Sequence, residues 1–343
     1  MSPSKNSNRN SNRKRSSNRN SKRRQNRKRR QNRKCGKNEN IPTPTPIPIP
    51  TPRTIKVSTK VDLIGSGQDY IYSIKLPDRT CIVAADGHGK DKVIECIRTM
   101  DWDSIFQLNI TQINSRIYTE ISNLRLTNGS GSTLTIVLVF DTHVDLLWTG
   151  DSSAKIYENG IEVCKTNDHD AWNRKEINRI EKNNIKSYPC NKLIVVDPYT
   201  IAVIPGARYF KYPSYSIDNS KYSVLPSYIS SEQFNMTQCL GHNLQLHPKT
   251  NGSCLSHKRY NFQVNPLTDE LYNYQRRVIL GSDGFWDMTC PADKLADRFL
   301  YPDAESLCKH SVDRWRKPDW ILNGKFSEPI KNGDDTCVGV IDL

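Results

Sequence analysis

Three apolar segments of this chain each run into an aspartate beside a glycine, and this recurrence constrains the fold more than any other feature. Residues 81–85 lead into Asp86-Gly87-His88-Gly89, residues 277–281 lead into Ser282-Asp283-Gly284, and residues 144–148 lead into Thr149-Gly150-Asp151. Short apolar runs are typical of buried strands, and glycine permits backbone angles and close approaches that a side chain would prevent. One Asp-Gly pair alone is a common turn signal. Two Asp-Gly pairs and one Gly-Asp pair at strand ends indicate a site.

The rest of the pattern predicts strands that follow one another directly. Strands are predicted over residues 54–60, 70–76, 80–85, 134–140, 144–148, 154–157 and 277–281 and in a final segment after Asp334-Asp335, and helices over 92–100, 106–124, 173–184, 292–300 and 304–316. Neighbouring strands without intervening helices favour antiparallel sheets. Residues 187–273 are rich in Tyr, Ser, Pro and Asn, so we expect long surface loops there, with brief strands at 193–196 and 200–204.

The chain has 343 residues and a net charge of +14, and the positive charge lies at one end. Residues 1–40 hold 16 Lys and Arg against a single acid, Glu39, which gives this segment +15 and the remainder −1. Such a segment cannot bury a core and is expected to be disordered. It could be a nuclear-import signal, could bind nucleic acid or another polyanion, or could serve only as a solubilising tail.

Proline occupies every second position from Pro42 to Pro52. Each proline fixes its own φ and favours extended angles in the residue before it, so residues 41–53 are predicted to be a stiff linker, with a docking site for an aromatic groove as the alternative. Residues 54–343 then form a single folded domain.

The ten cysteines form no Cys-x-x-Cys pair and no zinc-like cluster with histidine, so they are expected to be reduced thiols. The sequence has no apolar run of the ~20 residues needed to cross a bilayer and no signal-peptide core. A soluble, intracellular monomer, cytoplasmic or nuclear, is expected.

Five aspartates should converge in such a fold: Asp86, Asp151, Asp283 and Asp334 at strand ends and Asp69 at a strand start. Carboxylates gathered without a cation repel one another and hold protons, so the cluster predicts bound divalent metal. Oxygen ligands without a histidine or cysteine set favour Mg²⁺ or Mn²⁺ over zinc. Two such ions can clamp a phosphate ester and activate a water, which predicts metal-assisted phosphate hydrolysis.

Seven ordered motifs resemble the metal-dependent type 2C protein serine/threonine phosphatases over residues 54–343. They are Gln68-Asp69, Asp86-Gly-His-Gly89, Gly131-Ser-Thr133, Gly150-Asp-Ser152, Asp168-His169 with Glu176-x-x-Arg179-Ile180, Ser282-Asp-Gly-Phe-Trp-Asp287 and Asp334-Asp335. The resemblance implies an α+β fold, a four-layer αββα sandwich of two antiparallel sheets flanked by helices. It also implies a binuclear Mn²⁺ or Mg²⁺ centre, with a third, weaker metal, and a phosphoprotein substrate.

Site residues follow from the resemblance. Asp86 would bridge the two metals, with the Gly87 carbonyl on one of them and with Asp283 and Asp334 completing the other. Asp69 would act through water on a metal, and Asp151 would help to hold the third ion. His88 would be the general acid that protonates the leaving serine or threonine oxygen, although a histidine that only caps the turn is the alternative.

The chain departs from the family pattern at three places. Gln68 stands where the family usually has glutamate, and Ile64 stands where it has a phosphate-binding arginine, so Lys60 or Lys90 could grip the phosphate instead. Residues 237–242 match the family motif only in outline. These departures leave two alternatives to an active phosphoprotein phosphatase: a catalytically weak scaffold that binds phosphoproteins or nucleic acid, and a hydrolase of small phosphate esters.

Overall fold

The computed structural model describes residues 55–124, 129–169, 173, 175–176, 178, 192–203, 210–218, 233–234, 236, 238–241, 254–262, 275–289, 291–316, 320–322, 325–326 and 333–343. The chain divides into two units, Met1–Ile49 and Pro50–Leu343, and all of these residues belong to the second. The basic tail and the proline-rich linker lie outside the described residues. The three domain boundaries therefore stay predictions.

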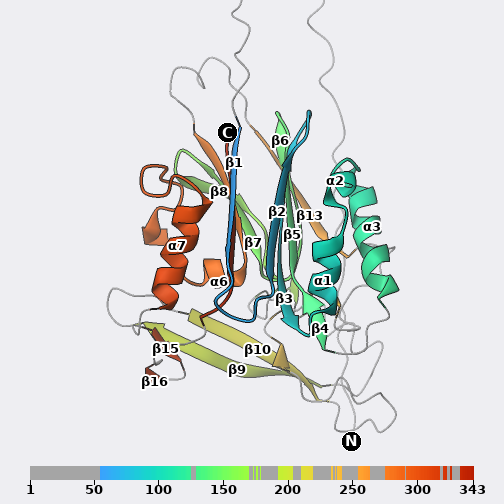
Figure 1. Cartoon of the computed structure of the whole chain (residues 1–343). Helices are drawn as coiled ribbons and strands as arrows, with labels where there is room; N and C mark the ends of the chain where they lie inside the picture. The colour runs from blue at the N-terminus through green and yellow to red at the C-terminus, as the bar shows by residue number, and fades with distance from the viewer. Residues whose placement is uncertain are drawn as a thin grey trace, which may run out of the picture. The chain divides into compact units, whose positions relative to one another are not determined.

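Two antiparallel sheets form the centre of the second unit (Figure 1). The first has the order β1-β17-β14-β7-β8, with bounds Lys56–Asp62, Thr336–Asp342, Arg276–Gly281, Ser153–Glu158 and Ile161–Lys165. The second has the order β12-β4-β3-β5-β6-β13, with bounds Leu240–Gly241, Ser130–Ser132, Thr80–Gly89, Leu134–Val139, His143–Thr149 and Ser256–Asn261, and β2 (Asp69–Lys75) also pairs with β3.

Hydrophobic packing joins the sheets and their helices into four layers. Ile82 and Val137 of the second sheet pack against Ala154, Val278 and Ile341 of the first, all of them almost fully buried. The outer face of the second sheet is covered by α1 (Lys92–Thr99), α2 (Trp102–Ile105) and α3 (Ile110–Asn123). The outer face of the first is covered by α6 (Asp283–Trp286) and α7 (Ala304–Trp315). The predicted αββα sandwich is confirmed (Figure 1).

The helix predicted over residues 106–124 begins later, at Ile110. Asn109 and Gln112 form a capping box, in which each side chain accepts a hydrogen bond from the backbone of the other residue. Phe106 belongs instead to the turn that ends α2, and Ile113 and Ile117 face the core as the apolar spacing predicts. Local capping therefore divides the predicted helix.

The helix predicted over residues 292–300 is wrong. Only a single 3-10 turn, η1 (Pro291–Asp293), forms, and Lys294 adopts a positive φ of 50°. Asp297 then accepts the backbone N–H groups of Phe299 and Leu300, which favours a turn over helix propagation. Most of the helix predicted over 173–184 lies outside the described residues.

The expectation of long loops in residues 187–273 is also wrong in part. A third antiparallel sheet has the order β11-β10-β9-β15-β16, with bounds Gln233–Phe234, Phe210–Asp218, Lys192–Val203, Trp320–Leu322 and Lys325–Phe326. Strand β9 joins the two predicted pieces across Pro198, and the register with β10 shifts between Tyr212 and Ser214. A register irregularity lets a strand tolerate a proline that lacks a backbone donor.

The seven described cysteines carry no disulfide, as predicted, and six of them are buried. Burial raises the pKa of Cys81, Cys254 and Cys308 to about 12, so these thiols stay protonated. No helix among the described residues is long and apolar enough to cross a membrane.

We predict that Ile82→Ala destabilises the domain by about 2–5 kcal/mol, because Ile82 is 1% exposed between the sheets and its removal leaves a cavity. Val163→Ala is the control, because Val163 is 40% exposed on edge strand β8 and should cost less than about 0.5 kcal/mol. Urea unfolding of both variants in EDTA measures the difference. Equal midpoints would contradict the assigned inter-sheet core.

Candidate metal centre

Strand β3 does not stop at Asp86, as the sequence suggests, but continues to Gly89. It pairs with β5 as far as Ala84 and then with β4, where His88 lies opposite Gly131. The change of partner occurs at Asp86, so this carboxylate lies at the point where the sheet divides. Gly87 is required there because a Cβ would lie 2.8 Å from the Cβ of Ile94.

Hydroxyl groups hold the backbone of Asp86. The Asp86 N–H donates to Thr133 Oγ1 at 3.0 Å, and the Asp86 carbonyl accepts from Ser132 Oγ at 3.0 Å and from the Thr133 N–H at 2.8 Å. Thr133 Oγ1 in turn lies 2.6 Å from Ser152 Oγ. The Gly-Ser-Thr and Gly-Asp-Ser motifs therefore position Asp86 through their hydroxyls.

Asp69 is 3% exposed and lies opposite Asp86 in the β2–β3 register. Its Oδ2 accepts a 2.7 Å hydrogen bond from Ser282 Oγ, and Ser282 Oγ accepts from the Cys337 N–H at 3.1 Å. Ser282 thus joins the start of β2 to the first sheet.

Asp283 and Asp334 are brought together by a close backbone contact. A Cβ at Gly284 would lie 2.0 Å from the carbonyl oxygen of Asp335 and 3.2 Å from the Cβ of Asp334, so only glycine fits. Trp315 Nε1 donates to the Gly284 carbonyl at 2.8 Å, which fixes the segment against α7. The predicted convergence of the ends of β14 and β17 is therefore present.

Asp151 follows Gly150, whose φ is +97° and whose Cβ would lie 2.6 Å from Thr133 Cγ2. The Gly150 N–H donates to His169 Nδ1 at 3.2 Å, and the Gly150 carbonyl accepts from the His169 N–H at 2.9 Å. The Asp168-His169 motif therefore anchors the turn that carries Asp151.

The five aspartates interact electrostatically. Burial raises the pKa of Asp69 to about 7, although the Ser282 hydrogen bond lowers it, and the charges of Asp283 and Asp335 raise it further. Burial also raises the pKa values of Asp283 and Asp334. The pKa of Asp86 is raised well above its usual range by burial first and then by the charges of Asp283, Asp69, Asp334 and Asp151. All five predicted metal aspartates thus belong to one cluster.

Burial and then Asp283, Asp168 and Asp287 raise the pKa of Asp151. Asp168 and Asp287 stand in the sequence motifs but were not predicted as site residues. The sequence also does not predict strand β12. Gly241, with a φ of +83°, pairs there with Gly131 beside His88, and the glycine itself is the signal that the sequence offers.

The donor chemistry of the cluster suits hard divalent ions. Within the described residues, no basic side chain forms an ion pair with any of the five aspartates. Oδ1 of Asp69 and Oδ1 of Asp151 are buried without a hydrogen-bond partner. However, no group of three or more acidic, histidine or cysteine side chains in the described part of the chain is already spaced to hold an ion. Binding would require these carboxylates to turn toward a common point.

The departures from the family pattern have structural explanations. Ile64 packs against the cluster beneath α7, where a Cβ at Gly333 would lie 2.6 Å from Ile64 Cδ1. Lys60 lies on β1 and pairs with Glu305 at 3.6 Å. Neither Ile64 nor Lys60 is therefore positioned to bind a phosphate. Lys90 is exposed and directly follows Asp86-Gly-His-Gly89, which we call the His88 segment.

Comparisons with known proteins give one partial family match and several structural similarities. A family model described as Protein phosphatase 2C matches residues 96–195. No curated protein sequence matches the chain. A serine-threonine phosphatase 2C from Toxoplasma gondii is similar in structure, with 14% identity, a TM-score of 0.51, and coverage of 84% of this chain and 94% of that chain.

A C. elegans sex determining protein is also similar in structure, with 15% identity and a TM-score of 0.50. The match covers 84% of this chain and 65% of that chain, so this chain spans about two thirds of that relative. At such identities the structures show the fold alone, and the family model adds the sequence match. Residues 96–195 thus match the protein phosphatase 2C family model, and the described domain shares its fold with these relatives.

Proposed function

We propose that this chain hydrolyses phosphoserine and phosphothreonine in proteins with the help of two Mn²⁺ or Mg²⁺ ions. The observation that carries this proposal is the set of five converging aspartates, which have no basic partner among the described residues and two of which bury an unpaired carboxylate oxygen. Such a cluster is costly unless cations neutralise it. The match of residues 96–195 to the protein phosphatase 2C model supports a phosphoprotein as the substrate.

Asp86, the Gly87 carbonyl, Asp283 and Asp334 would hold the two ions, with Asp69 acting through water and Asp151 beside a weaker third site. Bound ions would supply Lewis acidity, which polarises the phosphate and lowers the pKa of an attacking water. The hydroxyls of Ser132 and Thr133 hold the backbone of Asp86 and limit its movement.

His88 would donate a proton to the departing serine or threonine oxygen. This role is supported by the position of His88 on β3, two residues after Asp86 and opposite Gly131. The same strand would then carry the central metal ligand and the acid.

A catalytically weak scaffold is the second candidate, favoured by Ile64, which is packed away in an apolar cluster. Without an arginine guanidinium group to donate paired hydrogen bonds, the phosphate would be bound more weakly. Hydrolysis of a small phosphate ester is the third, because a fold does not determine its substrate.

We predict that Asp86→Asn and Asp283→Asn each lower Mn²⁺-dependent hydrolysis of a phosphothreonine peptide by at least about a hundredfold. Apo stability should be retained or increased, because each change removes repulsion within the cluster. Asp141→Asn, which changes an exposed aspartate of the β5–β6 turn, is the control and should keep full activity. Near-normal turnover in either site variant would exclude the metal proposal, whereas an inactive wild type with intact Mn²⁺ binding would favour the scaffold.

A second prediction concerns pH. The pKa of Asp69 is about 7 in the folded protein and 3.8 ordinarily, so the folded state holds this proton more tightly. The resulting stability is complete below about pH 4 and is lost as pH rises through about 7. In EDTA, Tm should therefore fall from about pH 5 to about pH 8, and Asp69→Asn should flatten this profile. An identical slope in the variant would show that Asp69 does not titrate as described.

We also propose that residues 1–40 bind polyanions such as nucleic acid, because this segment concentrates a charge of +15 in 40 residues. Binding of this kind depends on charge and not on nucleic-acid sequence, and it releases counterions. It would bring the domain to substrates on anionic structures.

Deletion of residues 1–40 should therefore abolish retention on heparin and DNA while phosphopeptide turnover is unchanged. Retention of the full chain should fall steeply with salt, because log K is linear in log salt. A variant with glutamine at the Lys and Arg positions of the tail separates charge from length. Equally tight binding by that variant would contradict the proposal.

A further inference from the structure

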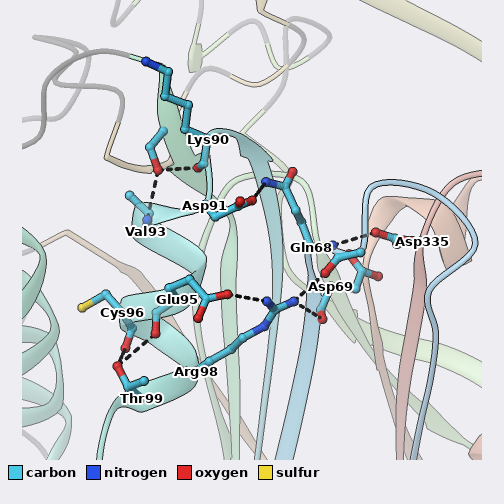
Figure 2. Close-up of polar contacts among 12 residues, drawn as sticks. Gln68, Asp69, Lys90, Asp91, Val93, Glu95, Cys96, Arg98, Thr99 and Asp335 are labelled. Atoms are coloured by element: carbon cyan, nitrogen blue, oxygen red, sulfur yellow. Dashed lines mark hydrogen bonds and ion pairs between the residues drawn. The ribbon is translucent and has the colours of Figure 1, made fainter.

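Gln68 joins the three segments that bring carboxylates to the centre. It is 6% exposed, its N–H donates to Asp335 Oδ2 at 2.8 Å, and its carbonyl accepts from the Gly87 N–H at 3.1 Å. Its side-chain nitrogen Nε2 donates to the Gly89 carbonyl at 3.0 Å and to Asp91 Oδ1 at 2.5 Å. Figure 2 shows this amide directed at Asp91, with Asp335 on the opposite side of the residue.

The orientation of the amide follows from the chemistry of its partners. A carbonyl and a carboxylate both only accept hydrogen bonds, so the NH₂ group of Gln68, and not its oxygen, must face them. A glutamate at residue 68 would have no donor to offer. It would place a second carboxylate against Asp91 and a third acceptor against the Gly89 carbonyl.

The carboxylate of Asp91 is used for this hydrogen bond and not to cap α1. It occupies the N-cap position of α1, yet its side chain makes no capping hydrogen bond to the helix. Its carboxylate instead accepts from Gln68, at the point where the His88 segment passes into the helix. The usual role of an aspartate at this position is thus replaced by a tertiary contact.

Arg98 of α1 holds the backbone on both sides of Gln68. Its Nη2 donates to the Gly67 carbonyl at 2.7 Å and to the Asp69 carbonyl at 3.3 Å, and its Nη1 pairs with Glu95 at 2.8 Å (Figure 2). The backbone on both sides of Gln68 is therefore fixed to α1, which leaves its side chain a defined direction toward Asp91.

We propose that Gln68 and Asp91 act as a matched pair of positioning residues that sets the place of the His88 segment relative to Asp69. Residue 68, where the family pattern usually has glutamate, is here an amide that donates to the carboxylate of Asp91. This inference rests on the proposed function for its catalytic consequence, but the pairing itself concerns the fold of the apo protein.

The family pattern alone predicts the opposite effect of a glutamate at residue 68. If residue 68 served chiefly as a metal ligand, Gln68→Glu would restore a charge and improve Mn²⁺ binding and turnover. If it serves as the donor to Asp91, the same substitution removes two hydrogen bonds and adds repulsion. Glutamate then becomes acceptable only when Asp91 is changed to a neutral residue.

The test uses Gln68→Glu, Asp91→Asn and the double variant of the full chain. Gln107→Glu is the control for one added negative charge, because Gln107 is exposed after α2. In EDTA, Gln68→Glu should lower Tm by several degrees, Asp91→Asn should change it by about 1 °C or less because an asparagine oxygen still accepts, and the double variant should recover most of the loss.

With Mn²⁺ and a phosphothreonine peptide, Gln68→Glu should lower kcat about tenfold while KM changes less than about twofold, since it displaces His88 and not the substrate contacts. The double variant should restore kcat. Gln68→Glu that melts like the wild type, or a double variant no more stable than the single one, would overturn the pairing. If the wild type has no metal-dependent activity, the proposed function fails while the melting data still decide the pairing.

Discussion

The structure depends on a difference in how the acids at the two ends of strand β14 are neutralised. Along strand β14, Arg276 pairs with Glu158 at 2.9 Å and Arg277 pairs with Asp342 at 2.9 Å, so the acids at the start of the strand are satisfied by the protein itself. Asp283, just beyond its end, has neighbouring carboxylates and no such partner among the described residues. Since a buried charge without compensation is costly, the acids at the start of β14 are stabilised within the protein, whereas Asp283 lies among carboxylates that repel it.

The cluster persists because the surrounding backbone is strongly held. Hydroxyls of Thr133, Ser152 and Ser282 connect the strands that carry Asp86, Asp151 and Asp69, and most of these bonds are buried. Repulsion among the carboxylates therefore acts on side chains whose main chain cannot easily separate. This arrangement trades some stability of the apo domain for a prepared site, a common compromise at functional centres.

Much of the site could be predicted from the sequence because its signals are local. An apolar strand followed by Asp-Gly marked Asp86 and Asp283, and the alternating strands indicated the two antiparallel sheets. What failed depended on distant partners. Strand β3 continues past Asp86 only because β4 is available to it, and β9 passes through Pro198 only because β10 shifts register.

The role of Gln68 likewise could not be read from neighbouring residues, because Gly89, Asp91 and Asp335 meet it only in three dimensions. The helix predicted over 292–300 failed for a local reason, since Asp297 competes for backbone donors that a helix would use. Sequence pattern thus located the aspartate cluster, while tertiary contacts determined how its residues are held.

Burial distinguishes one thiol among the seven cysteines that the structure describes. Only Cys96 of these is partly accessible, and it lies on α1, two residues before Arg98. A maleimide fluorophore should react there before it reaches the buried thiols of this set. Because Arg98 on the same helix contacts the carbonyls of Gly67 and Asp69, a dye at Cys96 would report on the environment of α1 without replacing any carboxylate.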